Sequence, residues 1–151
     1  MLVTITTDAS FYHKEKTGGY AFWIKSNIET VKCSGAFKSK VESPDDAEFK
    51  CIINSLHRLK SKKWTVTEII VNTDSQNTIS LVADGLSNLK YASDNLKAYK
   101  AIKNHFNCTI TFRHVKAHKH TNTARHWVNN WCDKEAKKAA RIKIKFGNIK
   151  E

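Results

Sequence analysis

The chain has 151 residues and a mass of 17.2 kDa, with 40% apolar and 26% charged residues. A chain of this length buries most of the surface that its unfolded form exposes, so it needs no disulfides to fold. The composition excludes a disordered protein, and the lack of an apolar run of about 20 residues excludes a membrane-spanning one. The N-terminus lacks the basic segment and cleavage site of a signal peptide. We therefore expect one cytoplasmic domain over residues 1–151, acting as a monomer.

The charge is strongly basic, with a formal net charge of +12 and a pI near 9.6. From Arg113 to Glu151 there are eleven basic and three acidic residues, and a basic tail begins at about residue 141. Charge concentrated in this way favours a polyanionic partner, most often a nucleic acid. A solvated basic face is the simpler alternative. Binding to a membrane surface is disfavoured, because the basic stretch is short and has few large apolar side chains.

The first three predicted elements are strands. Residues 2–7 are β-branched and alternate in polarity, which predicts a strand that ends at Asp8. The Gly18-Gly19 turn leads into a second strand over residues 20–24, and residues 29–37 form a third. Together they predict an antiparallel meander.

The first helix has a clear start. Ser43 is the expected N-cap, Pro44 occupies the first turn, and Asp46 closes a capping box. The helix then presents one apolar stripe, made of Phe49, Ile52, Ile53, Leu56 and Leu59.

The second half of the chain alternates between strand and helix. The expected elements are a strand over residues 68–73 that ends at Asp74, helices over 75–83 and 93–106, a strand over 109–115, a polar loop over 116–125, and a last helix with Val128, Cys132, Ala136 and Ala139 on one stripe. This order predicts an α/β fold with a five-stranded mixed sheet flanked by helices. The first and fourth strands should be parallel and central, so a site is expected where they end.

Four acidic residues are candidates for a metal site. Asp8 and Asp74 follow strands within the similar phrases Thr-Asp-Ala-Ser and Thr-Asp-Ser. Glu48 lies one turn into the first helix, and Asp133 lies in the last helix beside its apolar stripe. Taken singly, each is more typical of a turn, a helix cap or a solvated surface. Taken together, four oxygen ligands suit Mg²⁺ or Mn²⁺, and two such ions about 4 Å apart can promote phosphodiester cleavage.

The four cysteines show no C-x-x-C spacing, so we expect free thiols in a reducing compartment. Nor does the spacing of His114, His120 and His126 favour zinc. The four tryptophans are expected mostly in the core.

Six short motifs carry a resemblance to a known family. They are Thr7-Asp8-Ala9-Ser10, Gly18-Gly19-Tyr20, Ala47-Glu48, Thr73-Asp74-Ser75-Gln76, Val115-Lys116-Ala117-His118 and Cys132-Asp133-Lys134-Glu135-Ala136. In this order and at this spacing, the chain resembles type I ribonuclease H from end to end. The resemblance implies the ribonuclease H fold and an endonuclease that cuts the RNA strand of RNA–DNA hybrids.

The resemblance also implies roles for individual residues. Two Mg²⁺ ions, which Mn²⁺ can replace, would be held by Asp8, Glu48, Asp74 and Asp133. One ion would activate the attacking water and the other would stabilise the leaving 3′ oxygen, giving 5′-phosphate and 3′-hydroxyl ends. His118 would assist proton transfer and product release. Substrate contacts are expected from Ser10, Ser43 and Gln76.

The chain departs from the family pattern in several places. Ala9 replaces the usual glycine, and Ser43-Pro44-Asp45 replaces a Thr-Asn pair that contacts the two strands. The Trp-rich basic handle of some bacterial members is missing from residues 81–93. We hypothesise that the loop over 118–133 and the tail over 137–145 supply phosphate contacts instead. Two alternatives remain open: a nuclease of the same fold that cuts other structures, such as a junction resolvase, and a non-catalytic nucleic-acid-binding module.

Overall fold

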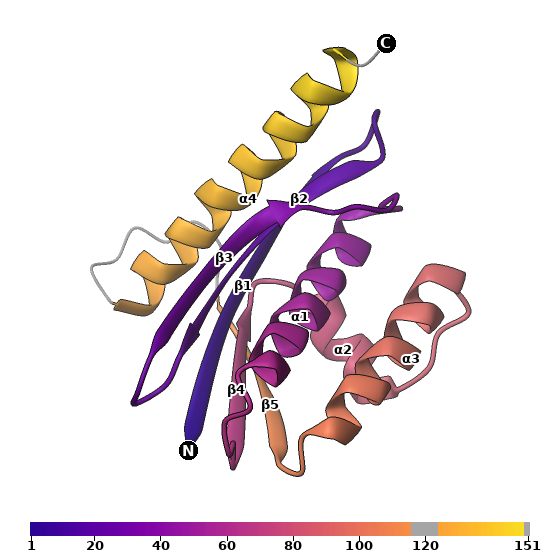
Figure 1. Ribbon diagram of the computed structural model, residues 1–151. Helices are drawn as coiled ribbons and strands as arrows, with labels where there is room; N and C mark the ends of the chain where they lie inside the picture. The colour runs from indigo at the N-terminus through magenta and orange to yellow at the C-terminus, as the bar shows by residue number, and fades with distance from the viewer. Residues whose placement is uncertain (116–123, 150–151) are drawn as a thin grey trace.

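The computed structural model describes residues 1–115 and 124–149, and it contains a five-stranded mixed sheet flanked by helices (Figure 1). The elements are β1 (Leu2–Tyr12), β2 (Thr17–Lys25), β3 (Thr30–Ala36), α1 (Pro44–Ser61), β4 (Glu68–Thr73), α2 (Gln76–Asp84), α3 (Lys90–His105), β5 (Thr109–His114) and α4 (Ala124–Ile149). The predicted element order is confirmed. In the described residues, no helix is both long and apolar enough to cross a membrane.

The sheet has the order β3-β2-β1-β4-β5, so β1 is central as predicted. It pairs antiparallel with β2 and parallel with β4, and Thr6 of β1 lies opposite Asn72 of β4. The predicted end of this strand at Asp8 was wrong. β1 continues to Tyr12, because residues 9–12 go on pairing with residues 17–20 of β2. Asp8 therefore projects from a paired strand and does not lie in a turn.

Helices cover the sheet on both faces (Figure 1). α1 packs over β1 and β2 and is itself covered by α3, and its predicted apolar stripe is buried in the main core. The start of α1 is as predicted, since the Ser43 hydroxyl accepts a hydrogen bond from the Asp46 N–H at 3.0 Å. α3 begins at Lys90, earlier than predicted, and no side-chain cap marks its start at Leu89.

α4 crosses the opposite face and lies very close to β2. A Cβ atom placed on Gly19 would lie 2.1 Å from the carbonyl oxygen of Ala136 and 2.6 Å from the backbone nitrogen of Ala140. The buried stripe of α4 consists of Cys132, Ala136 and Ala140. The predicted stripe was wrong at its end, where Ala140 replaces the half-buried Ala139, because the register of α4 is set by this close backbone approach.

The tryptophans are not in the core, which corrects that prediction. Trp127 is 57% exposed, and Trp23, Trp64 and Trp131 are half-buried. Trp23 packs edge to face against Trp127 and Trp131, with ring centroids 5.2 Å and 5.4 Å apart. Only small side chains fit under the middle of α4, so Trp23, Trp127 and Trp131 gather around its N-terminal turns, whereas Trp64 packs at the margin of the main core.

Candidate active site

Three carboxylates meet at one edge of the sheet. Asp8 comes from β1, Asp74 follows the neighbouring parallel strand β4, and Glu48 comes from the first turns of α1. Each offers one carboxylate oxygen to a group in which all three atoms lie within 4.8 Å of one another. Oxygen ligands grouped this closely are the set that a hard divalent cation prefers.

The backbone of β1 orients two of these groups. The N–H of Ala9 donates to Oδ1 of Asp8 at 2.9 Å and to Oε1 of Glu48 at 3.2 Å. The second oxygen of Glu48, Oε2, is buried and has no hydrogen-bond partner in the described residues. A buried oxygen without a partner is costly unless something else satisfies it. This donor set, with its orphaned oxygen, fits a divalent metal ion.

The carboxylates strongly perturb one another. Burial, followed by the charges of Asp74 and Asp133, raises the pKa of Asp8 from 3.8 to about 8. Burial and the charges of Asp8 and Asp74 raise the pKa of Glu48 well above 4.5. Both shifts arise because the charged form loses water and meets like charges. A bound divalent cation would offset the repulsion between the like charges and so lower both pKa values.

Asp133 lies near this group without belonging to the close trio. Its charge reaches Asp8, but its carboxylate forms an ion pair with Lys137, at 3.1 Å between Oδ2 and Nζ. The neighbouring Cys132 anchors α4, because its thiol donates to the carbonyl oxygen of Thr6 at 3.5 Å. The structure therefore brings all four predicted carboxylates to one region, with Asp133 at its margin.

A buried polar network holds the start of α1, the helix that carries Glu48. Asp46 is fully buried and accepts hydrogen bonds from the N–H of Glu42 at 2.9 Å and from Asn95 Nδ2 at 2.7 Å. It also pairs with Lys50 at 2.9 Å. The predicted capping box is thus shifted by one residue, because the Asp46 side chain bonds Glu42 and not the N-cap. This network fixes the direction from which Glu48 enters the site.

The predicted substrate contacts lie around the carboxylates. Ser10 is half-buried on β1, two residues beyond Asp8 and on the same face. Gln76 is exposed at the first turn of α2. Ser43 already uses its oxygen to cap α1, although its hydroxyl proton can still be donated. His118 lies outside the described residues.

Sequence reasoning missed two polar groups beside the site. Asn129 is buried, and its Oδ1 has no partner in the described residues. Its position one helical turn before Asp133 is the signal that could have indicated it. Asn72, two residues before Asp74, donates to the Thr6 hydroxyl at 3.3 Å and accepts from Arg113 Nε at 2.7 Å. Asn72 lies on the α4 side of the sheet, since it lines a pocket together with Val128 of α4.

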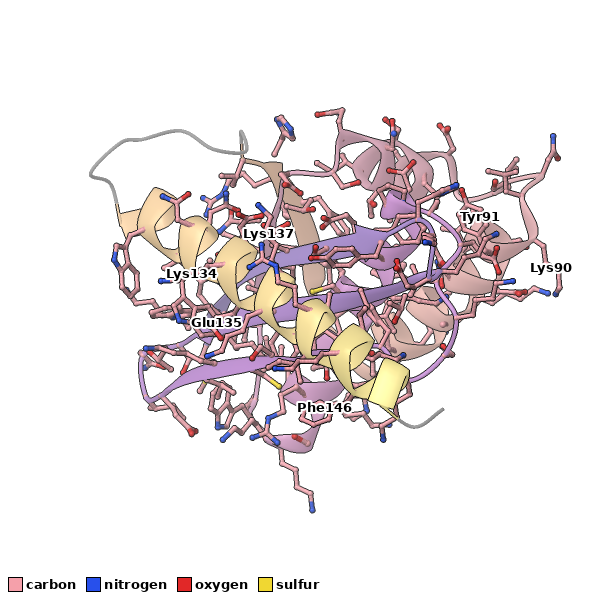
Figure 2. The ribbon with its side chains drawn as sticks, turned by 90° about the horizontal axis from the view of Figure 1, so that it is seen from above. Lys90, Tyr91, Lys134, Glu135, Lys137 and Phe146 are labelled. Carbon is pink, nitrogen blue, oxygen red and sulfur yellow. The ribbon has the colours of Figure 1, made fainter. Side chains whose placement is uncertain are left out.

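Basic residues recur along α4, and Figure 2 labels Lys134 and Lys137 in its first half and Phe146 near its end. Lys138, Arg141 and Lys145 are exposed, and Phe146 is 58% exposed near the helix end. Lys137 instead pairs with Asp133, and Lys143 donates to the carbonyl oxygen of Phe37. Only part of the predicted basic tail is thus free of these internal contacts.

Comparison with known structures places this fold among ribonucleases H. The N-terminal RNase H domain of Rv2228c from Mycobacterium tuberculosis, solved as a fusion with maltose-binding protein, is 16% identical, with a TM-score of 0.75 over 97% of this chain and 98% of that one. RNase H1 from the halophilic archaeon Halobacterium salinarum NRC-1 is 15% identical, with a TM-score of 0.70 over 92% and 97%. LC11-RNase H1, solved in complex with an RNA/DNA hybrid, is 18% identical, with a TM-score of 0.71 over 94% and 99%. These likenesses define a ribonuclease H-like fold.

The family model for RNase H matches residues 2–141, and the chain therefore belongs to the RNase H family, a family of divalent-metal-dependent nucleases. No curated protein sequence matches the chain. The resemblance seen in the six sequence motifs is thereby confirmed.

Proposed function

We propose that the chain is an endonuclease that hydrolyses the RNA strand of RNA–DNA hybrids and leaves 5′-phosphate and 3′-hydroxyl ends. The observation that carries the proposal is the trio of Asp8, Glu48 and Asp74, with ligand oxygens within 4.8 Å of one another, in a chain that belongs to the RNase H family. The hybrid bound by the structurally similar LC11-RNase H1 supports the choice of substrate.

Asp8, Glu48, Asp74 and Asp133 would hold the divalent metal, which we propose to be two Mg²⁺ ions, with Mn²⁺ as a substitute. Bound metal supplies water activation and stabilisation of the charge that develops on the leaving oxygen. The Ala9 N–H orients Asp8 and Glu48 toward the metal position. Asp133 would join them by exchanging its contact with Lys137 for the metal.

His118 is the proposed group for proton transfer, because an unperturbed imidazole gains and loses a proton near neutral pH. Ser10, Ser43 and Gln76 are the proposed contacts to the substrate strands. Ser43 would donate its hydroxyl proton while its oxygen continues to cap α1.

A second candidate keeps the fold and broadens the substrate to other nucleic-acid structures. It is favoured by Asp45, an exposed carboxylate at the start of α1 that accepts from Asn77 Nδ2 at 3.2 Å. A negative charge there repels phosphate and weakens strand-specific contacts. The Pro44→Asn/Asp45→Asn variant tests this candidate, because it should raise the preference for hybrid over double-stranded RNA.

The central experiment follows cleavage of a labelled RNA–DNA hybrid, with matched double-stranded RNA and DNA, in Mg²⁺ with and without chelator. We expect cleavage of the hybrid's RNA strand alone, and we expect chelator to abolish it. Asp8→Asn and Asp74→Asn should each reduce the rate at least about 100-fold, which corresponds to roughly 3 kcal/mol of transition-state stabilisation. Asp84→Asn, an exposed carboxylate at the end of α2, is the matched control and should retain activity.

The other outcomes of this experiment contradict the proposal in distinct ways. Cleavage of the DNA or RNA duplexes would identify a broader nuclease. Binding of the hybrid without any cleavage in Mg²⁺ or Mn²⁺ would identify a non-catalytic binding module.

A further inference from the structure

A cleft separates α1 from the β2–β3 side of the sheet. Its volume is about 670 Å³, and its walls come from both strands, from the segment that follows β3, and from the outward face of α1. The cleft exists because α1 packs over β1 and β2, so the neighbouring surface of the edge strand β3 is left open. None of the proposed metal ligands lines it.

The floor of the cleft is apolar. Tyr20, Phe22 and Phe37 form it, and Phe22 and Phe37 are themselves buried. Tyr20 stacks on Phe22 with ring centroids 6.1 Å apart and is tilted against Phe37 at 5.1 Å. The three rings thus pack together, and they offer a concave apolar seat to an incoming side chain.

The rim of the cleft is cationic. Lys38, His57 and Arg58 are exposed along it, and Lys50 is half-buried. Lys50 is neutralised by Asp46, but Lys38 and Arg58 form no ion pair within the part of the chain that the structure describes. No aspartate or glutamate is among the residues that line the cleft. The rim therefore has positive charge available for an anionic partner.

An apolar seat beneath a positive rim is complementary to a peptide that carries both acidic and large apolar side chains. A nucleic-acid duplex fits less well, because its outward-facing phosphates cannot reach a recessed floor. Stacking of single-stranded bases needs open ring faces, and Phe22 and Phe37 are buried. We propose that the cleft binds a short acidic peptide segment of a partner protein, with an aromatic or aliphatic side chain on the floor and carboxylates on Lys38 and Arg58. This binding is independent of the proposed nuclease activity.

The test is a selection of random twelve-residue peptides displayed on phage, with the full chain as bait. We expect the selected peptides to be rich in Asp and Glu around at least one large apolar residue. Fluorescence anisotropy of a labelled selected peptide should then show at least tenfold weaker binding to Lys38→Glu/Arg58→Glu. Asn54→Trp, which places an indole in the cleft from α1 without changing the charge, should weaken binding similarly.

The matched control is Lys97→Glu/Lys103→Glu, which makes the same change of charge at exposed positions on α3. It should bind the peptide like the unmodified chain, and all variants should keep their melting temperature and their hybrid affinity. Selected peptides without acidic enrichment would overturn the proposal. An equal loss of peptide binding in the α3 control would also overturn it. If Lys38→Glu/Arg58→Glu lost as much affinity for the hybrid as for the peptide, the cleft would be assigned to nucleic acid and the proposal would fail.

Discussion

The carboxylates of Asp8 and Glu48 share a single backbone donor, the N–H of Ala9, at 2.9 Å and 3.2 Å. Burial raises the pKa of both groups, and the charge of Asp8 raises that of Glu48 further. Two buried carboxylates at this separation are stable only when a proton or a cation lies between them. The site is therefore arranged so that a metal ion competes with a proton.

The first prediction concerns the pH dependence of stability without metal. The pKa of Asp8 is raised to about 8 and that of Glu48 is raised in the same direction, so the folded state holds more protons than the unfolded state between about pH 4 and pH 8. The free energy of unfolding should therefore fall as the pH rises through this range. In chelator we expect a loss of at least about 1.4 kcal/mol, the equivalent of one pKa unit.

Chemical denaturation at pH 5.5 and pH 8, with chelator or with Mg²⁺, measures this effect. Mg²⁺ should restore the stability at pH 8, and Asp8→Asn should be more stable than the unmodified chain at pH 8 in chelator. Equal stability of Asp8→Asn and the unmodified chain at pH 8 in chelator would show that the carboxylates do not destabilise the fold.

The second prediction concerns the contact between α4 and β2. Gly19→Ala places a methyl group against the backbone of Ala136 and Ala140, which cannot move aside as a side chain could. We expect a loss of about 3 kcal/mol or more, the upper range for overpacking. Activity should fall as well, because α4 carries Asp133.

Gly85→Ala is the control for this substitution. Gly85 has a positive φ of 74° and no atom within 4 Å of an added Cβ, so only backbone strain of about 1–2 kcal/mol is expected. Urea denaturation compares the two variants. A smaller loss in Gly19→Ala than in Gly85→Ala would contradict the close approach of α4.

The third prediction concerns the buried Asp46. Asp46→Ala leaves Lys50, Asn95 and the Glu42 N–H without their acceptor, so we expect a loss of about 3–5 kcal/mol, as for one partner removed from a buried ion pair. Asp94→Ala is the matched control, because its ion pair with Lys90 is exposed and is worth less than about 1 kcal/mol. Thermal unfolding measures both, and similar losses would contradict a structural role for the network.

The fourth prediction concerns the basic surface of α4. Lys138, Arg141 and Lys145 are exposed, whereas Lys137 and Lys143 already have internal partners. Lys138→Gln/Arg141→Gln/Lys145→Gln should lower the slope of log affinity against log salt by about 2 to 3 for an RNA–DNA hybrid, since each phosphate contact contributes about 0.9. Anisotropy titrations across a salt series measure the slope. An unchanged slope would show that the hybrid does not contact these three residues.

Local sequence was sufficient for most of the fold. Period-two alternation predicted the start of β1, a short apolar run predicted β4, and the Ser43 cap predicted the start of α1, because these signals depend on near neighbours. The six short motifs identified the family and predicted the four carboxylates. The resemblance predicted which residues meet at the site, but not their distances or surroundings.

Long-range contacts decided the rest. The extension of β1 past Asp8 depends on its partner residues in β2, and the register of α4 depends on backbone contact at Gly19. The outward position of Trp23, Trp127 and Trp131 also depends on how α4 packs on the sheet, which composition cannot predict. The orphaned Oε2 of Glu48 and the cleft beside β3 likewise arise only when distant segments pack together. The sequence by itself determined the family and predicted which four carboxylates form the site, whereas the tertiary structure decided how closely they meet and which surfaces stay open.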